Sequence, residues 1–365
     1  MKFRCERDLF LEAVATASRA VNPRSSHPVL SGILFEFKEN QIQITGSDLD
    51  LTITVFLDIQ IEEPGSFVAP ARLITEIIKS LNSGFVEITS TEEELQIKSG
   101  RADFAIQLLP VEDFPSLDAP KTDSVVIPTL SFVEAIRQVI RAASNDDSRP
   151  MLTGVLLASE ENSLRMVATD SYRLAIRDIE GQSVLQKEQR VLVPARALGE
   201  LQRLLSSEKE VTLKLGNFDV IFETGNVKLR TRLLETEFPN YQQLLPSGYP
   251  NKLNIERIPF LEALKRVKLL VQDTTSPIRL TLSENSVELS VITHEVGRAS
   301  ETVPAEYSGE EMTIAFNPNY LIEGTEATKS KNIIIEALNT LKPVTLKPDN
   351  SDEKFIYLLM PIRIN

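Results

Sequence analysis

Residues Met166 to Arg177 read M-V-A-T-D-S-Y-R-L-A-I-R. Both ends of this stretch are apolar, which predicts two short strands. Between them lies Thr169-Asp170-Ser171-Tyr172, a run of residues that favour turns. The stretch therefore predicts a β-hairpin that places a tyrosine and an arginine just past its turn.

The sequence around this hairpin occurs three times. One segment reads S-S-H-P-V-L-S-G-I-L-F-E-F from Ser25, D-S-R-P-M-L-T-G-V-L-L-A-S from Asp147 and T-T-S-P-I-R-L-T-L from Thr274. Two further markers follow in the same order, a proline after a short apolar run and a Leu-Leu pair. Such regular recurrence predicts three units of about 120 residues, close to the usual size of a domain. We place the domain borders at residues 1–120, 121–248 and 249–365.

Each unit has the same order of elements: a helix, several strands, a second helix opened by the proline, and more strands. The strands alternate apolar and polar residues, which favours antiparallel sheets with one packed face. Two helices can cover that face, so the sequence predicts an α+β fold of three repeated domains. Apolar residues at helical spacing predict six helices, over Asp8–Val21, Ala71–Asn82, Thr129–Ala143, Ala195–Ser207, Ile258–Val271 and Asn319–Lys331.

Composition excludes several classes of protein. The chain of 365 residues has 42% hydrophobic and 25% charged residues, as soluble globular proteins do. It lacks an apolar run long enough to span a membrane. A single cysteine, Cys5, suits a reducing cytoplasm, where we expect the protein to work.

An enzyme has little support in the sequence. The two histidines, His27 and His294, are far apart in the chain, and one cysteine cannot build a zinc cluster. Neither a phosphate-binding loop nor a dinucleotide-binding glycine motif is present. We therefore expect no catalytic site, no bound metal and no cofactor.

The net charge of −13 argues against a protein that coats nucleic acid with its whole surface. The six expected helices nevertheless carry a small positive balance, so the acidic residues concentrate in strands, loops and linkers. Helices often combine Lys and Arg with Glu, which is one explanation of this difference. The other is that the helices share one surface that faces a polyanion.

The three units resemble those of the bacterial DNA polymerase III β subunits, the sliding clamps. The most specific matches are Ala168–Ala175 (A-T-D-S-Y-R-L-A), Leu108–Pro115 (L-L-P-V-E-D-F-P) and Tyr357–Ile364 (Y-L-L-M-P-I-R-I). The resemblance covers the whole chain. It implies a homodimeric ring, closed head to tail, with helices lining the hole and sheets outside. Such a ring would encircle double-stranded DNA and tether the polymerase for processive synthesis.

The resemblance also implies which residues approach DNA. A weakly positive lining touches phosphates without reading sequence, so the ring can slide. The matching cations are Arg24, Arg72, Lys79, Arg137, Arg141, Arg149, Arg196, Arg203, Lys265 and Arg266.

A pocket between the second and third domains is the other feature that the resemblance implies. In the family it takes a short peptide with a glutamine and apolar anchors. The matching positions are Leu152, Thr169, Ser171, Tyr172, Arg173, Leu174, Pro246, Tyr320, Pro343, Leu358, Met360, Pro361 and Ile362. Because the Ser-Tyr-Arg-Leu turn occurs only in the middle repeat, we expect it to form half of this pocket rather than a repeated structural turn.

The implied subunit interface joins Phe104 and Ile106 to Leu269 and Leu270 of a second copy. The implied partners besides DNA are the DNA polymerase III α subunit, a clamp loader complex, and other DNA polymerases and repair factors that carry a clamp-binding peptide. The alternative that we keep open is a monomeric three-domain scaffold, which would bind peptides without encircling DNA.

Overall fold

The computed structural model describes residues 1–365 apart from 39–40, 116–123, 161, 182–184, 187–188, 206–209, 246–247, 272–275, 294–295, 351 and 364–365. The chain forms two compact units. The first combines Met1–Thr129 with Gly199–Leu233, and the second combines Leu130–Leu198 with Leu234–Asn365. Every strand pair of the described residues is antiparallel, as the alternating sequence pattern predicts.

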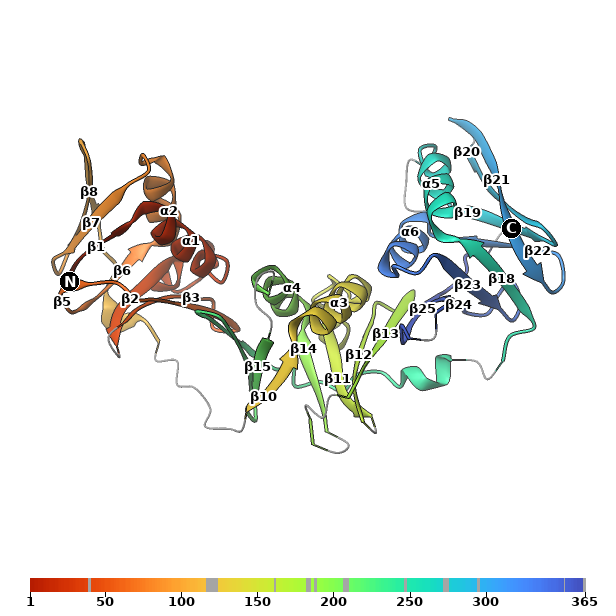
Figure 1. The fold of residues 1–365 in the computed structure, drawn as a ribbon, viewed down its shortest axis with the longest axis horizontal. Coiled ribbons are helices and arrows are strands. Elements are labelled where there is room, and N and C mark those ends of the chain that lie inside the picture. The colour runs from red at the N-terminus through yellow and green to blue at the C-terminus, as the bar shows by residue number, and fades with distance from the viewer. Residues whose placement is uncertain are drawn as a thin grey trace. The chain divides into compact units, whose positions relative to one another are not determined.

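Two sheets build the first unit (Figure 1). The five-stranded sheet has the order β5 (Ile61–Glu63), β1 (Lys2–Glu6), β7 (Phe85–Ser90), β8 (Glu94–Ser99) and β9 (Ala102–Gln107). The eight-stranded sheet has the order β10 (Ser124–Pro128), β15 (Glu210–Leu215), β16 (Asp219–Thr224), β17 (Val227–Arg232), β4 (Leu51–Leu57), β3 (Gln41–Ser47), β2 (Gly32–Lys38) and β6 (Ser66–Pro70).

One twelve-stranded sheet runs through the second unit. Its order is β14 (Arg190–Pro194), β11 (Gly154–Glu160), β12 (Ser163–Thr169), β13 (Arg173–Glu180), β25 (Phe355–Leu359), β24 (Val344–Pro348), β23 (Asn332–Ala337), β18 (Asn251–Glu256), β21 (Gly297–Ser308), β20 (Ser286–Thr293), β19 (Ile278–Ser283) and β22 (Met312–Phe316). The hairpin predicted around Thr169–Tyr172 consists of β12 and β13, so this prediction is confirmed.

All six expected helices are present, although each ends before the residue that we predicted. They are α1 (Arg7–Ser18), α2 (Ala71–Ser80), α3 (Thr129–Val139), α4 (Ala195–Leu204), α5 (Arg257–Lys268) and α6 (Pro318–Ala327). The sequence overestimated their C-terminal ends because apolar residues continue the helical spacing into the following turn; Leu81, for example, is buried but has an extended backbone.

The apolar stripes of the helices face the sheets, as their periodicity predicts. In α2, Ile74 and Ile78 are fully buried, and burial of a side chain of this size contributes about 2 kcal/mol. α1 packs so closely on β3 that a Cβ atom at Gly46 would lie 2.1 Å from the carbonyl oxygen of Ala17. Glycine is therefore required at this position of β3 by close packing.

α6 forms despite the weak helix propensity of its sequence. The side chain of Asn317 accepts hydrogen bonds from the backbone N–H groups of Asn319 and Tyr320, which caps the first turn. A Cβ atom at Gly324 would lie 2.4 Å from the ring of Tyr357. The glycine that lowers helix propensity thus makes room for a fully buried tyrosine of β25.

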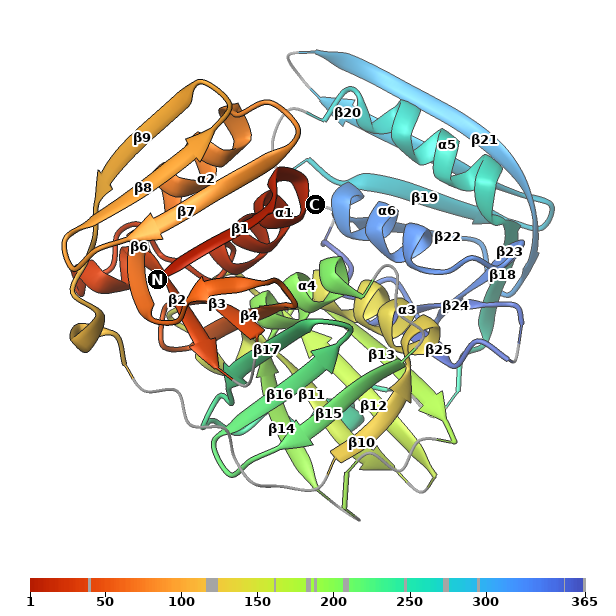
Figure 2. The same ribbon diagram turned by 60° about the vertical axis from the view of Figure 1, so that its left-hand side comes forward.

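Strand pairing joins neighbouring repeats in the same way twice. In the first unit β4 pairs with β17, which belongs to the second repeat (Figure 2). In the second unit β13 pairs with β25, which belongs to the third repeat. In both joints, the strand after the turn of one repeat pairs with the last strand of the next repeat.

Candidate functional site

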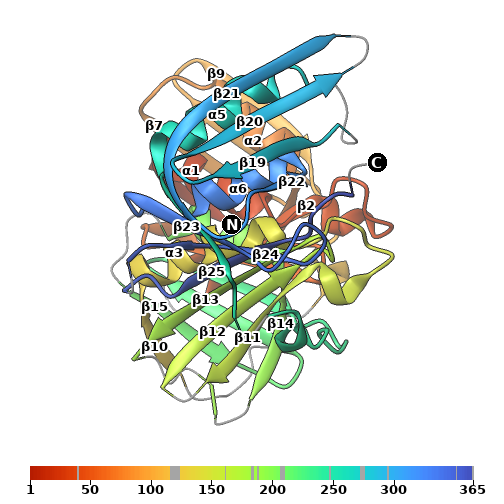
Figure 3. The same ribbon diagram turned by 90° about the vertical axis from the view of Figure 1, so that its right-hand side faces the viewer.

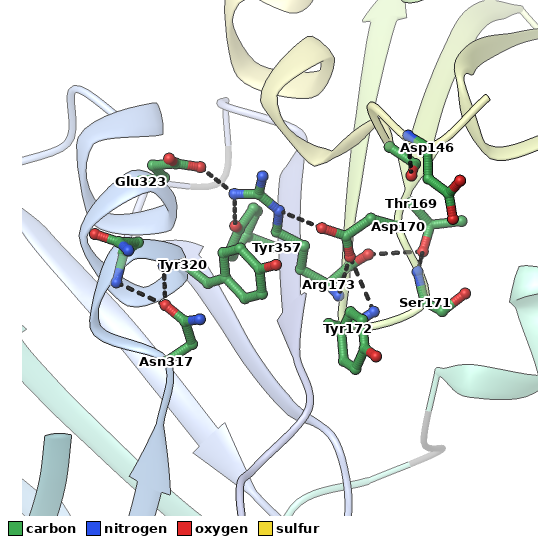
Figure 4. Close-up of polar contacts among 12 residues, drawn as sticks. Asp146, Thr169, Asp170, Ser171, Tyr172, Arg173, Asn317, Tyr320, Glu323 and Tyr357 are labelled. Atoms are coloured by element: carbon green, nitrogen blue, oxygen red, sulfur yellow. Dashed lines mark hydrogen bonds and ion pairs between the residues drawn. The ribbon is translucent and has the colours of Figure 1, made fainter. Parts of the chain in front are cut away.

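The turn between β12 and β13 is held by its own side chains (Figure 4). The Oδ1 atom of Asp170 accepts hydrogen bonds from the backbone N–H groups of Tyr172 at 2.9 Å and Arg173 at 3.0 Å. The hydroxyl of Thr169 donates to the carbonyl oxygen of Arg173 at 2.6 Å. Ser171 has a φ of 79°, which reverses the chain and leaves the side chain of Tyr172 59% exposed.

Arg173 points away from solvent and connects this turn to α6. Its Nε atom donates to Oδ2 of Asp170 at 3.0 Å, and its Nη1 atom donates to Glu323 and, at 3.3 Å, to the hydroxyl of Tyr357. The guanidinium also lies 4.2 Å from the centre of the Tyr320 ring. Burial raises the pKa of Tyr357, so this hydroxyl is neutral and available for the hydrogen bond.

Apolar side chains form a cluster on the opposite face of β13. Leu174, Ile176 and Leu358 are buried in it together with residues of β11, β12 and β14. Tyr241 and the partly buried Leu245, from the connection that follows the second repeat, pack against the same cluster. The cluster gives the turn and the C-terminal segment a rigid support.

The C-terminal segment lies beside the turn and is fixed by two backbone hydrogen bonds. The N–H of Met360 donates to the carbonyl oxygen of Tyr172 at 2.9 Å, and the N–H of Ile362 donates to that of Ala315 at 2.8 Å. Met360 is 38% exposed and Leu341, which precedes β24, is 60% exposed. Tyr172, Met360 and Leu341 therefore offer apolar surface on a well-anchored backbone.

The predicted pocket residues differ in their exposure. Four belong to the interior rather than to an open surface: Leu152, Thr169, Leu174 and Leu358. Ser171, Tyr172 and Met360 are exposed, Tyr320, Pro343, Pro361 and Ile362 are half-buried, and Arg173 is buried by its ion pairs. Pro246 lies outside the described residues.

The expectation about this turn needs one correction, because its backbone is not unique to the middle repeat. The equivalent turn of the first repeat, between β3 and β4, has the same backbone: Leu49 also has a φ of 79°. Its Asp48 Oδ1 accepts hydrogen bonds from the N–H groups of Asp50 and Leu51, as Asp170 does in the second repeat. The turn therefore recurs in the first and second repeats with different side chains, and its place in a partner pocket stays a prediction.

Among the predicted DNA contacts of the first unit, the helical arginines are exposed but paired. Arg72 binds Glu76 at 2.9 Å and Arg203 binds Glu200 at 2.5 Å, both within one helix. Lys79 and Arg24 are exposed. Arg196, at the start of α4, belongs to the second unit and is exposed as well.

Three of the predicted contacts of the second unit form ion pairs between elements. Arg141 and Lys265 both bind Glu326, and Arg266 binds Glu301 at 2.6 Å. Arg149 binds Asp146 at 2.9 Å. Arg137 differs because it is bonded to Glu134 and to the carbonyl oxygens of Glu326 and Ala327, the last residues of α6. This side chain holds α3 against α6.

The predicted interface residues lie at two separate surfaces. On β9, the edge strand of its sheet, Phe104 is half-buried and Ile106 is buried. Phe104 lines a cavity of about 660 Å³ together with the exposed Phe85. After the end of α5, Leu269 is 81% exposed and Leu270 is half-buried.

Family models match along nearly the whole chain. The N-terminal domain of the DNA polymerase III beta subunit matches residues 1–118, the central domain 126–240 and the C-terminal domain 242–363. The chain belongs to this family. The beta sliding clamps of Streptomyces coelicolor and Staphylococcus aureus strain Mu50 are each 33% identical to it, over 376 and 377 residues, with 100% of this chain and at least 99% of theirs aligned.

Solved structures of sliding clamps have the same fold. The DNA polymerase sliding clamp of Bacillus subtilis is 30% identical with a TM-score of 0.95, and the DNA polymerase III subunit beta of Pseudomonas aeruginosa is 29% identical with a TM-score of 0.93. Both alignments cover 100% of each chain. The fold is therefore the three-domain clamp fold, and the predictions of family and fold class are confirmed.

Membership in the sliding clamp family settles what kind of function the chain has. The family is non-catalytic and serves processive replication by DNA polymerase III, so DNA and a polymerase are its partners. The described residues contain no cluster of His, Cys, Asp and Glu that could hold a metal ion. No helix in the described part of this clamp chain is both long and apolar enough to cross a membrane.

Sequence reasoning missed the acidic partners of the clamp's cations. In the sequence Asp170 stands out only as a turn residue, and nothing in the sequence marks Glu323 and Glu326 as partners of these cations. A pair such as Arg72 and Glu76 can be seen in the sequence from its spacing of four residues on a helix. No local pattern connects Arg173 with Glu323, because they come from different repeats.

Proposed function

We propose that two copies of this chain close head to tail into a ring around duplex DNA, with β21 of one copy pairing with β9 of the other. The observation that carries this proposal is the repeated strand joint. β4 with β17 and β13 with β25 are two equivalent joints within one chain. β21 and β9 are the corresponding strands left for the next joint.

Both of these strands have a side available for pairing. β9 pairs with β8 alone among the described strands. In β21, residues 297–304 pair with β20 on one side (Figure 3). On the other side, β18 pairs with β21 only from Ala305 onward. The other side of the first part of β21 therefore has no partner strand in the described residues, which supports a joint with a second copy.

Side chains beside these edges support the same arrangement. Leu269, 81% exposed in one chain, is an apolar side chain that a partner would cover. The cavity lined by Phe85 and Phe104 beside β9 is a suitable acceptor for it. A head-to-tail contact that closes after two copies gives a ring instead of a filament.

We further propose that α-helices face the DNA and that Arg24, Arg72, Lys79, Arg141, Arg149, Arg196, Arg203, Lys265 and Arg266 approach phosphates. The exposed positions of most of these side chains support this role, whereas Arg137 contributes through the packing of α3 on α6. Contacts of this kind are non-specific and salt-dependent. They leave the ring free to slide along the duplex.

For partner binding we propose the surface formed by Tyr172, Tyr320, Leu341, Met360 and Pro361. An extended peptide with apolar anchors suits this surface, because the exposed groups are aromatic and aliphatic and the backbone beneath them is fixed. The DNA polymerase III α subunit, a clamp loader complex and other polymerases or repair factors are the proposed owners of such peptides. The cytoplasm is the proposed place of this work, and the proposed domain borders stay near residues 120 and 248.

Retention on closed circular DNA tests the ring. After loading by a bacterial clamp loader and sealing of the circle, we expect the clamp to stay on closed circular DNA through gel filtration at moderate salt and to be lost after the circle is cut. Equal retention on circular and linear DNA would show ordinary binding and refute encirclement. If the molecular mass in solution at micromolar concentration equals that of a single chain, the result would instead support the monomeric scaffold.

A further inference from the structure

Glu326 of α6 holds two of the proposed DNA contacts at once. Its Oε2 atom accepts from Nη1 of Arg141 at 3.2 Å, and its Oε1 atom accepts from Nζ of Lys265 at 2.7 Å. Arg141 follows α3, and Lys265 belongs to α5. One carboxylate thus connects three helical segments of the second unit, which also lie near one another in Figure 2.

This carboxylate is charged under physiological conditions. The hydrogen bond from Lys265 and that from Arg141 lower the pKa of Glu326 below its ordinary value of 4.5. The two cations are about half exposed, at 52% for Arg141 and 53% for Lys265. Solvent therefore reaches this cluster, and an approaching phosphate can reach it as well.

Glu134 provides a contrast on the neighbouring face. It binds Arg137 at 2.5 Å and Lys329 at 2.9 Å, but the guanidinium of Arg137 is also bonded to two carbonyl oxygens of α6. Arg137 is only 26% exposed and cannot leave these partners without uncovering them. Arg141 and Lys265 have no such second set of bonds in the described residues, so they can exchange Glu326 for another anion.

We propose that Glu326 competes with DNA phosphate for Arg141 and Lys265 and thereby weakens the hold of the clamp on duplex DNA. The proposal rests on the proposed function, because it requires these cations to face DNA. Exposed ion pairs are individually weak, so the exchange of one anion for another has a low cost. A carboxylate that recovers the cations after each phosphate contact favours rapid sliding over tight binding.

Glu326→Gln tests the proposal, since it keeps the size of the side chain and removes its charge. We expect the variant to bind a short duplex several-fold more tightly at low salt. The slope of log affinity against log salt should steepen by about 1 to 2, because up to two further cations become available to release counterions. The loaded variant should also diffuse more slowly along stretched DNA.

Glu288→Gln is the matched control, since it changes the net charge equally at an exposed position of β20. In the background Arg141→Gln plus Lys265→Gln, Glu326→Gln should have no further effect on affinity. Glu326→Asp should restore the wild-type salt slope. If Glu326→Gln and Glu288→Gln give the same slope, the proposal is wrong.

Two measurements distinguish competition by Glu326 from a purely structural role and from failure of the ring itself. A structural role of Glu326 would lower the melting temperature without a change of the salt slope, so a lower melting temperature with an unchanged slope refutes the competition. Retention of the wild-type clamp on closed circles tests the ring independently. If circles retain both the wild type and Glu326→Gln, and the variant slides as fast as the wild type, the competition proposal is refuted while the ring proposal stands.

Discussion

Leu49 and Ser171 occupy equivalent positions one repeat apart, and both have a φ of 79°. This region of backbone conformation is unfavourable for residues with a Cβ atom. In both turns the aspartate directly before the residue accepts two backbone hydrogen bonds. The turn is therefore defined by its aspartate and tolerates different residues at the strained position.

Substitution of Ser171 should reverse the usual order of glycine and alanine. We expect Ser171→Gly to be more stable than Ser171→Ala by about 1 kcal/mol, because glycine adopts positive φ without steric cost. At Lys79, near the end of α2, alanine should instead be the more stable by about 1 kcal/mol. Urea unfolding of the four variants measures both differences. The same order at both positions would contradict a strained turn.

Hydrophobic periodicity and the internal repeats predicted most of the fold. The stripe of Ile74, Ile77 and Ile78 predicts a helix, because the spacing of apolar residues alone indicates a helix with one buried face. The three repeats then predicted the architecture of segments with weaker patterns, including α6, which contains Gly324. The reason for that glycine, the ring of Tyr357, comes from a strand that the local sequence cannot indicate.

The site was harder to predict than the fold, for a physical reason. Whether a charged side chain is available depends on its partners, and these lie in other repeats. Arg173 was expected at the edge of a pocket, yet Asp170 and Glu323 bury it. Arg137 was expected at the DNA, yet it is bonded to the end of α6. Exposed leucines, such as Leu341, likewise become visible only in three dimensions.

Loss of Arg173 should destabilise the second unit strongly. Arg173→Ala leaves Asp170 without its buried cation, and we expect a cost of about 3 kcal/mol. Arg165 is a suitable control, since it binds Asp178 through two hydrogen bonds but is 26% exposed, and Arg165→Ala should cost about 1 kcal/mol. Urea midpoints measure both. Equal effects of the two substitutions would show that the Arg173 network adds nothing.

The ion pairs of Glu134 should make the free energy of unfolding depend on pH. Burial alone would raise its pKa, but hydrogen bonds from Arg137 and Lys329 outweigh burial and lower the pKa below 4.5. The unfolded chain therefore takes up this proton first, so the stabilisation is present above about pH 4.5 and is lost as the pH falls through the lowered pKa. The stability difference between wild type and Glu134→Gln should shrink from pH 7 to pH 3. A difference that stays constant would contradict this assignment.

Cys5 should resist thiol reagents until the first unit opens. It is 3% exposed, and burial raises the pKa of its thiol to about 12. Only the thiolate reacts, so at pH 8 the native protein should react at least roughly a thousandfold more slowly than the same protein in urea. Absorbance after addition of a disulfide reagent measures both rates. Similar rates in buffer and in urea would show that the thiol is accessible in the folded protein.

Leu269 should decide whether two copies associate. We expect Leu269→Asp to convert the dimer into a monomer, because the substitution places a charge where the proposed interface is apolar. The fold of the single chain should survive, since this side chain is 81% exposed and contributes little to the core. Leu130→Asp is the matched control: Leu130 is 87% exposed on α3, away from β9 and β21 in sequence, and its substitution should leave the dimer intact. Light scattering over a dilution series measures the mass, and circular dichroism checks the fold. A dimer that dissociates equally in both variants, or in neither, would place the interface elsewhere on the chain.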